Sequence, residues 1–535
     1  MRSVMKHDFS QVPRANIQRS AFDRSHGYKT TFDSGYLVPI FVDEALPGDT
    51  FNCNMTGFAR LNTPLHPFMD NLFMDTFFFA VPVRLLWDKW QKFNGEQVDP
   101  GDSTDYLCPI MVSPPSVEEP PAPGGYSVGS LSDYFGIPTQ VPSLSHSAFW
   151  HRAYNLIYNE WFRDQNLQDS VVVDRGDGPD DPADYVLLRR GKRHDYFTSS
   201  LPWPQKGPAV DLPMSGNAPV LGIGKENAVF PSTDVSVRQS DGSVSEFASA
   251  SYIGEDNSNN VFYVREGAAG YPDIYADLTD VAAATINQLR QAFQIQKLYE
   301  RDARGGTRYT EIIRSHFGVI SPDARLQRPE YLGGGSSPVN VTPIAQNSAT
   351  VSGSPQGNLA AIGTAVLNRH GFTKSFTEHC VLIGLVSVRA DLNYQQGLNR
   401  MWSRRTRWDF YWPALAHIGE QAVLNKEIYA QGSVDPEDDA KVFGYQERYA
   451  EYRYKPSVIT GQLRSTFAQS LDTWHLAQDF DNLPELGPEF IVEDPPVSRV
   501  VAVPTYPDFI LDTFFNLKCV RPMPMYGVPG LIDHF

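Results

Sequence analysis

The sequence predicts a mainly β fold in which strands from both ends of the chain pair into one jelly-roll sandwich. The composition is the first observation: 535 residues include 41 Pro, 40 Gly, 32 Phe and 25 Tyr. This mixture favours strands, turns and ordered loops over helical bundles. The second observation is that runs rich in β-branched and aromatic residues cluster at both ends, with helices and loops between them. One sandwich therefore requires early strands to pair with late ones.

The N-terminal region divides into a basic arm and a first group of strands. Residues 1–34 lack a periodic apolar face and carry six Lys or Arg against three Asp, which predicts an extended arm that lies on a partner. Residues 35–90 hold three strand-like runs separated by turn formers. These runs are "YLVPIFV", "TFNCNMTGFARL" and "DTFFFAVPVRLL".

The middle of the chain is predicted to be insertions. Residues 91–207 combine long proline-rich loops with a helix near 146–166. Residues 208–276 are rich in Gly, Ser, Asn and Asp, which predicts a projection into solvent. Residues 277–358 hold a helix over 278–304, whose apolar side we expect to pack against a larger body, and a Gly/Ser-rich connection at 333–358.

Residues 359–535 supply the remaining strands and the C-terminal segment. The strand signals are "FTEHCVLIGLVSVRADL", "PSVITGQLRSTF" and "DFILDTFFNLKCVRPMPMYG".

Charge and cysteine usage exclude several classes of protein. A net charge of −17 argues against a protein whose whole surface binds nucleic acid, so any such site must be a local patch. The four cysteines are far apart and form no CxxC pair, which disfavours a zinc knuckle or a secreted disulfide scaffold. The most apolar run is broken by Asp75, Pro82 and Arg84, so we expect no membrane span and no secretion signal.

The chain carries no HExxH, GxSxG, GxxxxGK[ST] or GxGxxG motif, which argues against an enzyme without excluding one, and the sequence assigns no catalytic residue, cofactor or metal site. The acidic run 174–184 could bind calcium, but it misses the EF-hand spacing, and a solvated acidic turn is favoured. His146 and His151 lie five apart, off the spacing that puts two imidazoles on one metal, and are expected to cap or pack.

Two basic segments suggest nucleic-acid contact. In residues 399–412, arginines interleave with aromatic residues, as in surfaces where bases stack on rings and arginines hold phosphates; packing of the rings into the core is an equal alternative. In "LLRRGKRHDYF", Arg189, Arg190, Lys192 and Arg193 flank a glycine. That pattern suits a turn that touches phosphate, although an exposed hairpin tip is favoured.

Four blocks of the sequence resemble the major capsid proteins of gokushoviruses, which are small single-stranded DNA phages of the Microviridae. The blocks are "IQRSAFDRSHGYKTTFDSGYLVPIFVDEALPGDTF", "YNEWFRDQNLQ", "DYFTSSLPWPQKG" and "FGYQERYAEYRYKPS". The resemblance implies an eight-stranded viral jelly roll that assembles into a T=1 icosahedral shell around circular single-stranded DNA, without catalysis. It also implies that 208–276 forms a protrusion at the three-fold axes.

The resemblance sets the expected partners and location. The partners are further copies of the chain, the DNA genome, minor virion proteins and a receptor on the host cell; the locations are the virion and, during assembly, the host cytoplasm. The expected DNA-binding residues are Arg14, Arg19, Arg24, Lys29, Arg400, Arg404, Arg405, Arg407, Trp402 and Trp408. The expected subunit-interface residues are Tyr445, Arg448, Tyr449, Tyr452, Arg453 and Tyr454, in a stretch that turns a corner between two elements.

Two other classes of function stay open from the residues alone. A carbohydrate-active or cupin-like β enzyme could use carboxylates that the sequence does not pair. A non-structural single-strand-binding protein is disfavoured by the net charge of −17.

Overall fold

A computed structural model of the chain describes residues 18–116, 124–207, 286–323, 325, 327–352 and 355–526, together with short strands between 220 and 276. Contacts between Cα atoms divide the chain into two units, residues 205–304 and the remainder. Most of the predicted projection 208–276 and residues 1–17 of the predicted arm lie outside the described residues.

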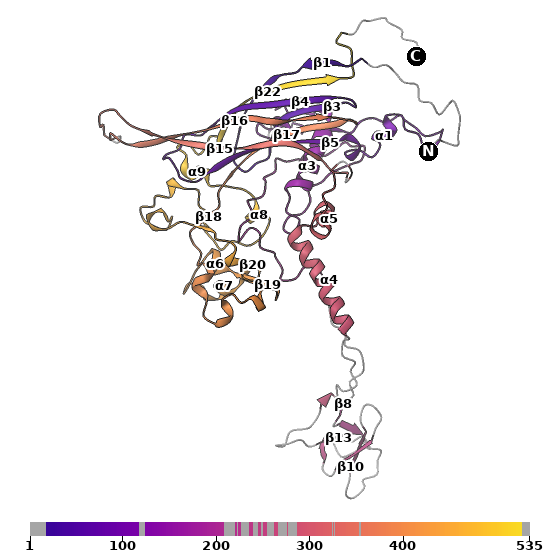
Figure 1. Ribbon diagram of the computed structural model, residues 1–535, viewed down its shortest axis with the longest axis vertical. Helices are drawn as coiled ribbons and strands as arrows, with labels where there is room; N and C mark the ends of the chain where they lie inside the picture. The colour runs from indigo at the N-terminus through magenta and orange to yellow at the C-terminus, as the bar shows by residue number, and fades with distance from the viewer. Residues whose placement is uncertain are drawn as a thin grey trace. The chain divides into compact units, whose positions relative to one another are not determined.

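Eight strands form the predicted jelly roll (Figure 1). The first sheet, here called the open sheet, has the order β2 (His26–Phe32), β22 (Phe509–Arg521), β4 (Thr50–Leu61) and β16 (Leu359–Ser375), with β1 (Ser20–Asp23) also paired to β22. The second, here called the covered sheet, has the order β15 (Glu330–Ala345), β5 (Leu72–Pro82), β17 (Cys380–Ala390) and β3 (Val38–Ala45). All of these pairs are antiparallel, and the far half of β15 pairs with β16 to join the sheets. The predicted fold class is confirmed.

The main hydrophobic core lies between the two sheets. The ring of Phe41 in β3 lies 5.2 Å from that of Phe515 in β22 and 6.3 Å from that of Phe372 in β16. Phe372 also packs against Phe78 of β5, at 5.4 Å. Aromatic pairs at such distances add specific contact energy to the burial of apolar area.

The second face of the covered sheet is also buried. Helix α3 (Phe149–Ile157) and the following π-helical turn (Tyr158–Phe162) pack on β5 and β17, and α3 falls within the helix predicted at 146–166. Phe79 of β5 contacts Trp161 at 5.5 Å. Figure 1 shows α3 on the side of the β5–β17 sheet away from β22.

A smaller lobe lies between β17 and β22 in the sequence. It contains β18 (Asn393–Tyr394), β19 (Glu420–Leu424), α6 (Asn425–Ile428), α7 (Pro436–Ala440), β20 (Val442–Glu447), β21 (Ser457–Val458) and α8 (Pro488–Ile491). Its own aromatic core includes Phe197, Tyr394, Phe443 and Phe490. This lobe carries the tyrosine-rich stretch and the Arg/Trp segment.

The remaining elements connect or decorate these parts. They are α1 (Trp90–Phe93), β6 (Ile110–Val112), α2 (Leu131–Tyr134), β7 (Ser145–Ser147), α4 (Ile286–Gly305), α5 (Tyr309–Phe317) and α9 (Val497–Val500). Residues 205–304 also contain the short strands β8 (Val220–Leu221), β9 (Ile223–Lys225), β10 (Val235–Arg238), β11 (Val244–Phe247), β12 (Ala250–Ile253), β13 (Phe262–Arg265) and β14 (Tyr275–Ala276).

The prediction that residues 333–358 form a Gly/Ser-rich connection was wrong for its first half, which belongs to strand β15. Glycine is required here for close approach of strands rather than for a turn. A Cβ atom on Gly334 would lie 2.0 Å from the carbonyl oxygen of Thr76, and one on Gly335 would lie 2.6 Å from the ring of His370. The glycines let β15 run close to both β5 and β16.

Three other predictions differ from the structure. The run "PSVITGQLRSTF" forms only the two-residue strand β21, because Gly461 at φ 70° turns the chain out of extended geometry. Residues 20–32 of the predicted arm form β1 and β2. The side of α4 that was expected to pack is exposed at Phe293 (65%) and Leu298 (49%), because none of the described residues covers these side chains.

Candidate assembly surface

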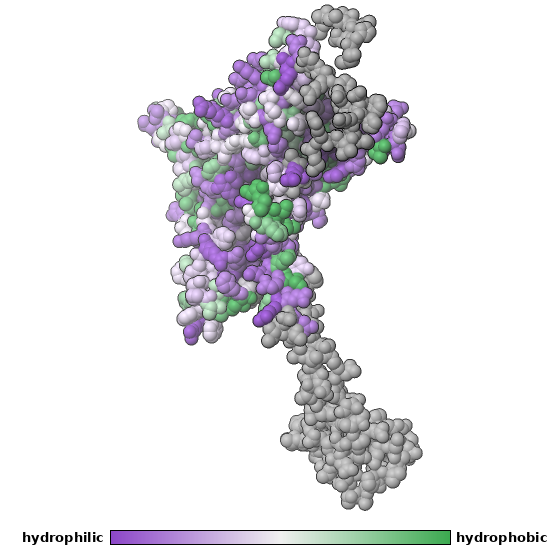
Figure 2. All heavy atoms as spheres, turned by 45° about the vertical axis from the view of Figure 1, so that its right-hand side comes forward, coloured by the Kyte–Doolittle hydropathy of each residue, from purple (hydrophilic) through white to green (hydrophobic). Residues whose placement is uncertain are grey.

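Exposed aromatic side chains gather on the lobe between β17 and β22. We call them the aromatic surface; they are Trp402, Trp408, Phe410, Tyr411, Trp412, Tyr452 and Tyr454, with exposed fractions from 39% to 71%. Large exposed apolar patches are uncommon on monomeric proteins and mark interaction sites. Figure 2 shows groups of hydrophobic residues that interrupt a mainly hydrophilic face of the molecule.

Local hydrogen bonds fix the aromatic surface. The carboxylate of Asp409 accepts from the backbone N–H groups of Thr406 at 2.7 Å and Arg405 at 2.8 Å, and these bonds lower the pKa of Asp409. The indole N–H of Trp412 donates to the carbonyl of Arg407 at 3.0 Å. Because the turns are held before any partner arrives, little ordering entropy is lost on binding.

Two of the four predicted DNA-binding arginines in this segment are used by the fold. Arg400 pairs with Glu427 at 2.9 Å and Arg404 pairs with Glu451 at 3.2 Å. Burial raises the pKa of Glu427, although Arg400 opposes the shift. Breaking a buried pair of this kind leaves an uncompensated charge, so both arginines are committed within the chain.

The other two arginines are exposed, as are both predicted tryptophans. The guanidinium of Arg407 lies 4.6 Å from the ring centre of Trp412 and 5.4 Å from that of Trp408. Trp402 is 71% exposed and Arg405 is also exposed. Stacking of arginine on tryptophan keeps a broad apolar face with a cationic edge.

The tyrosine-rich stretch turns the expected corner. Strand β20 ends at Glu447, Tyr449 adopts a left-handed backbone at φ 63°, and a 3₁₀ turn follows over Ala450–Tyr452. Tyr449 is buried; its ring lies 5.3 Å from that of Tyr411 and its hydroxyl donates to the carbonyl of Trp408 at 3.3 Å. This tyrosine therefore packs within its own chain.

Three other members of the predicted interface set, Tyr445, Arg448 and Arg453, make contacts within the chain. Tyr445 exchanges two backbone hydrogen bonds with Leu201, both 2.8 Å, and Arg453 pairs with Glu447. Arg448 donates to the carbonyl of Trp408 at 3.1 Å.

The two predicted sets converge on one surface. Tyr452 lies under the guanidinium of Arg404 at 4.2 Å and 6.2 Å from the ring of Tyr411. Residues assigned from the sequence to DNA and to subunit contact therefore adjoin. Phe410, Tyr411 and Trp412 belong to the same segment, 399–412, whose rings the sequence indicated as stacking surfaces for bases.

The N-terminal cations that the structure describes bind within the chain. Arg19 donates to the carbonyl of Gly48 at 2.6 Å, Arg24 pairs with Asp43 at 2.6 Å and Lys29 pairs with Asp512 at 2.7 Å. Arg14, the fourth predicted member, lies outside the described residues.

The basic turn at 189–193 is not a hairpin tip, which corrects the favoured sequence interpretation. Arg189 pairs with Asp494, Arg190 with Asp75 and Arg193 with Asp391. Lys192 donates to the carbonyl of Phe490 at 2.7 Å. Each cation has a partner far away in the sequence, so the segment ties the covered sheet to the smaller lobe.

The acidic run and the two histidines also have structural partners. Asp180 accepts from the buried guanidinium of Arg152 at 2.7 Å and from the hydroxyl of Tyr185 at 2.7 Å. His151 shares a hydrogen bond with Ser132 at 2.9 Å, and His146 shares one with the hydroxyl of Tyr126 at 2.7 Å. Across the described part of the chain, no group of three or more His, Cys, Asp or Glu is arranged to hold a metal ion.

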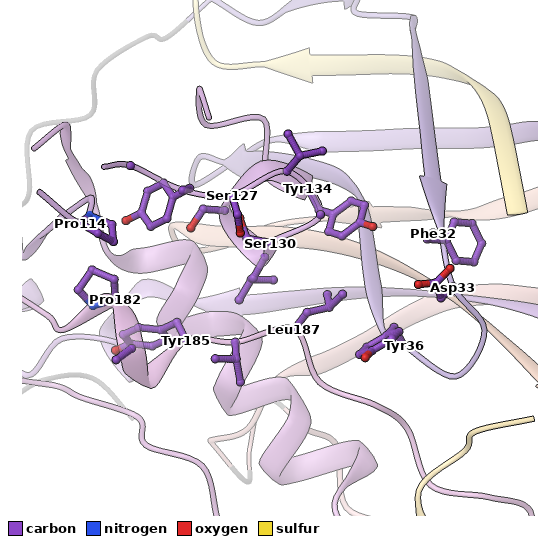
Figure 3. A pocket seen from close by; sticks show the side chains of 18 of the residues that line it. Phe32, Asp33, Tyr36, Pro114, Ser127, Ser130, Tyr134, Pro182, Tyr185 and Leu187 are labelled. Carbon is purple, nitrogen blue, oxygen red and sulfur yellow. The ribbon is translucent and has the colours of Figure 1, made fainter. Parts of the chain in front are cut away.

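A pocket of about 970 Å³ lies at the end of β2 (Figure 3). The loop that contains α2 and the segment 181–187 form its walls, and Tyr36, Tyr134 and Leu187 line it. Its charged lining residues are Asp33 and Asp181, and no Lys or Arg is among the described residues that line it. Because its only charged lining groups are carboxylates, this pocket is unsuited to phosphate.

No helix in the described ranges is both long and apolar enough to cross a lipid bilayer.

Comparison with known proteins agrees with the resemblance seen in the sequence. The chain is 50% identical to capsid protein VP1 of Bdellovibrio phage phiMH2K, over 99% of this chain and 98% of that protein. It is 46% identical to capsid protein VP1 of Chlamydia phage 1, over 99% and 98%, and 37% identical to that of Spiroplasma virus 4, over 98% and 97%. These relatives confirm the resemblance to gokushovirus capsid proteins. Residues 10–531 match the phage family described as capsid protein (F protein), and the chain belongs to that family.

Proposed function

We propose that this chain is the major capsid protein of its virion and assembles with further copies of itself into a T=1 icosahedral shell around circular single-stranded DNA. The observation that carries the proposal is the aromatic surface, which is fixed by local hydrogen bonds yet uncovered in one chain. Aromatic residues and arginine are the side chains that supply most of the binding energy at protein interfaces. A neighbouring subunit is the cover that such a surface needs.

The remaining parts of the proposal follow from the family and the charge. We place the protein in the virion and, during assembly, in the host cytoplasm, with minor virion proteins as partners. The insertion 208–276 would contact a receptor on the host cell, and the chain would act without catalysis or cofactor. The net charge of −17 suits an outer surface in water, with genome contact confined to local patches.

The first test is the size and shape of particles formed by the purified chain. Negative-stain microscopy with light scattering should show uniform closed particles far heavier than one 59.9 kDa subunit. Particles of mixed size without closed symmetry, or a chain that stays monomeric with and without added DNA, would contradict the proposal.

Substitution of the aromatic surface tests the interface. The double variant Trp402→Ala/Trp408→Ala should raise the chain concentration needed for assembly by about 30-fold or more, because truncation of even one interface anchor costs about 2 kcal/mol. Tyr506→Ala is the matched control, since Tyr506 is 67% exposed and lies outside the aromatic surface. Light scattering across a concentration series measures the threshold. An unchanged threshold in the double variant would remove the aromatic surface from the interface.

A further inference from the structure

We infer that the outward face of the open sheet is a binding platform for single-stranded nucleic acid; this inference rests on the proposed enclosure of a genome. The platform consists of side chains that point away from the core on β1, β2, β22, β4 and β16. Its members are Asp23, Lys29, Asn52, Asn54, Thr56, Phe58, Arg60, Ile362, Val366, Ile510, Asp512, Phe514, Asn516 and Lys518, with Arg369 in the adjoining bulge of β16.

Two exposed phenylalanines lie side by side on the platform. Phe514 of β22 is opposite Thr56 of β4, and Phe58 of β4 is opposite Asp512 of β22. The two rings are therefore diagonal neighbours on one face, at a typical spacing of about 7–8 Å between backbones. Phe514 is 51% exposed and Phe58 is 41% exposed. Bases of a single strand stack on such rings irrespective of sequence.

Amide side chains surround the two rings. Asn54 of β4 is directly opposite Asn516 of β22, and Asn52 is opposite Lys518. All three asparagines are exposed. An amide both donates and accepts hydrogen bonds, so it can meet the edge of any unpaired base.

The charge of the platform has the opposite sign to that of the chain. The platform carries four cations and two carboxylates, whereas the chain as a whole has 45 Lys and Arg against 62 Asp and Glu. The four cations are Lys29, Arg60, Arg369 and Lys518. Of the two carboxylates, Asp512 is paired with Lys29 at 2.7 Å, and Asp23 is opposite Lys518 in the β1–β22 register.

The uncommitted cations of the platform differ from those predicted from the sequence. Arg400 and Arg404 each have a carboxylate partner, whereas Arg60 and Arg369 form no ion pair with any residue that the structure describes. The guanidinium of Arg60 lies 5.5 Å from the ring centre of Phe58. A cation beside an exposed ring supplies both phosphate contact and a stacking surface.

The test compares the DNA affinity of variants that lack the exposed rings, the cations or one apolar side chain of the platform. Fluorescence anisotropy would measure the affinity of the unassembled full chain for a labelled oligodeoxythymidine at several salt concentrations. Phe58→Ala/Phe514→Ala should weaken binding by about 30-fold or more, because two stacked bases are lost and each contributes about 1–3 kcal/mol. Arg60→Ala/Lys518→Ala should reduce the slope of log affinity against log salt by about 1.4, because each phosphate that a cation neutralises on a single strand contributes about 0.7 to that slope.

Ile510→Ala is the matched control, because Ile510 is 59% exposed on the same face but has no ring or charge. Its DNA affinity should stay within about twofold of that of the unchanged chain. The inference is overturned if the double phenylalanine variant binds DNA normally, if the control loses as much affinity, or if the salt slope does not change.

Shell formation by the same variants separates the two proposals. If Phe58→Ala/Phe514→Ala and Ile510→Ala both block assembly while DNA affinity is normal, the face contacts a second copy of the chain and the platform is wrong. If the unchanged chain binds DNA through these residues but never forms closed particles, the capsid proposal fails while the platform stands. Closed particles with reduced DNA content in the phenylalanine variant alone would support both.

Discussion

The same tetrapeptide, Asp-Thr-Phe-Phe, occurs once in each sheet, and its two copies have opposite surroundings. In β5 of the covered sheet, Asp75 is buried and contacts Arg190 at 2.7 Å and Arg389 at 3.0 Å. In β22 of the open sheet, the side chain of Asp512 is 57% exposed and has one exposed lysine partner. The side-chain directions nevertheless agree, since Phe78 and Phe515 both point into the core between the sheets.

The difference shows that position along the strand determines which face a side chain points to, whereas the elements packed on that face determine whether the side chain is buried. Successive side chains of a strand point to opposite faces, so four identical residues alternate identically in both sheets. Helix α3 and the 189–193 turn cover the outer face of β5, and no described element covers the outer face of β22. The first Phe of the tetrapeptide is Phe77 in β5 and Phe514 in β22. Phe77 accordingly packs against Phe162, whereas Phe514 is 51% exposed.

Removal of the buried carboxylate should give the largest contrast between the two copies. Asp75→Ala leaves two largely buried guanidinium groups without their counter-charge, and we expect the free energy of unfolding to fall by about 3–5 kcal/mol. Urea denaturation of the unassembled chain measures the loss.

Asp512→Ala is the matched control for this prediction. Its partner Lys29 is 74% exposed, so the expected loss is below about 1 kcal/mol. Equal losses of unfolding free energy in the two variants would mean that the elements packed on the covered sheet do not strengthen its ion pairs.

Low pH should reduce the free energy of unfolding through His151 in α3, the helix that packs on the covered sheet. Burial, followed by the nearby His146, lowers the pKa of His151 to about 3. The unfolded chain therefore binds a proton on this ring below about pH 6.5, where the folded chain does not. The stability that the neutral ring contributes is complete above pH 6.5 and is lost at about 1.4 kcal/mol per pH unit as pH falls towards 3.

The variant His151→Gln isolates this contribution, because glutamine keeps a hydrogen-bonding group near Ser132 and does not titrate. Between pH 7 and pH 5, the unchanged chain should lose about 2 kcal/mol more than the variant in urea denaturation. Identical pH dependence in the two proteins would mean that the pKa of His151 is the same in the folded and the unfolded chain. His370 in β16 of the open sheet is also buried, and burial lowers its pKa, but it is present in both proteins and cancels in their comparison.

The sequence predicted strands where the pattern is local and complete. The alternation in "FILDTFFNLKC" and the continuous apolar run in "CVLIGLVSV" correspond to one-sided and two-sided burial in β22 and β17. Strand β15 was missed because glycines at 333–335 carry a turn signal, and only the tertiary structure reveals their role in close approach. The partners of the 189–193 cations were equally out of reach, since Arg190 and Asp75 are 115 residues apart in the chain.

The candidate sites were predicted in composition but not in geometry. The sequence pointed to Trp402, Trp408 and the tyrosine stretch, yet it could not show that Arg400 and Arg404 meet buried glutamates. It also missed Phe514, although a signal was present: an aromatic residue in the polar phase of an alternating strand lies on the solvent face. Such a residue has no role in the core, and this makes it a candidate for binding.

The smallest expected effect concerns the first phenylalanine of each tetrapeptide. Phe77→Ala removes a ring that packs on Phe162 at 5.3 Å and lies 5.2 Å from the guanidinium of Arg190, so the free energy of unfolding should fall by between about 1 and 2 kcal/mol. Phe514→Ala should change it by less than about 0.5 kcal/mol. Urea denaturation of both variants makes the comparison, and a loss in Phe514→Ala equal to that in Phe77→Ala would show that the outer ring supports the fold. A negligible loss would mean instead that Phe514 is retained at no benefit to stability, which is the expected behaviour of a residue that binds a partner.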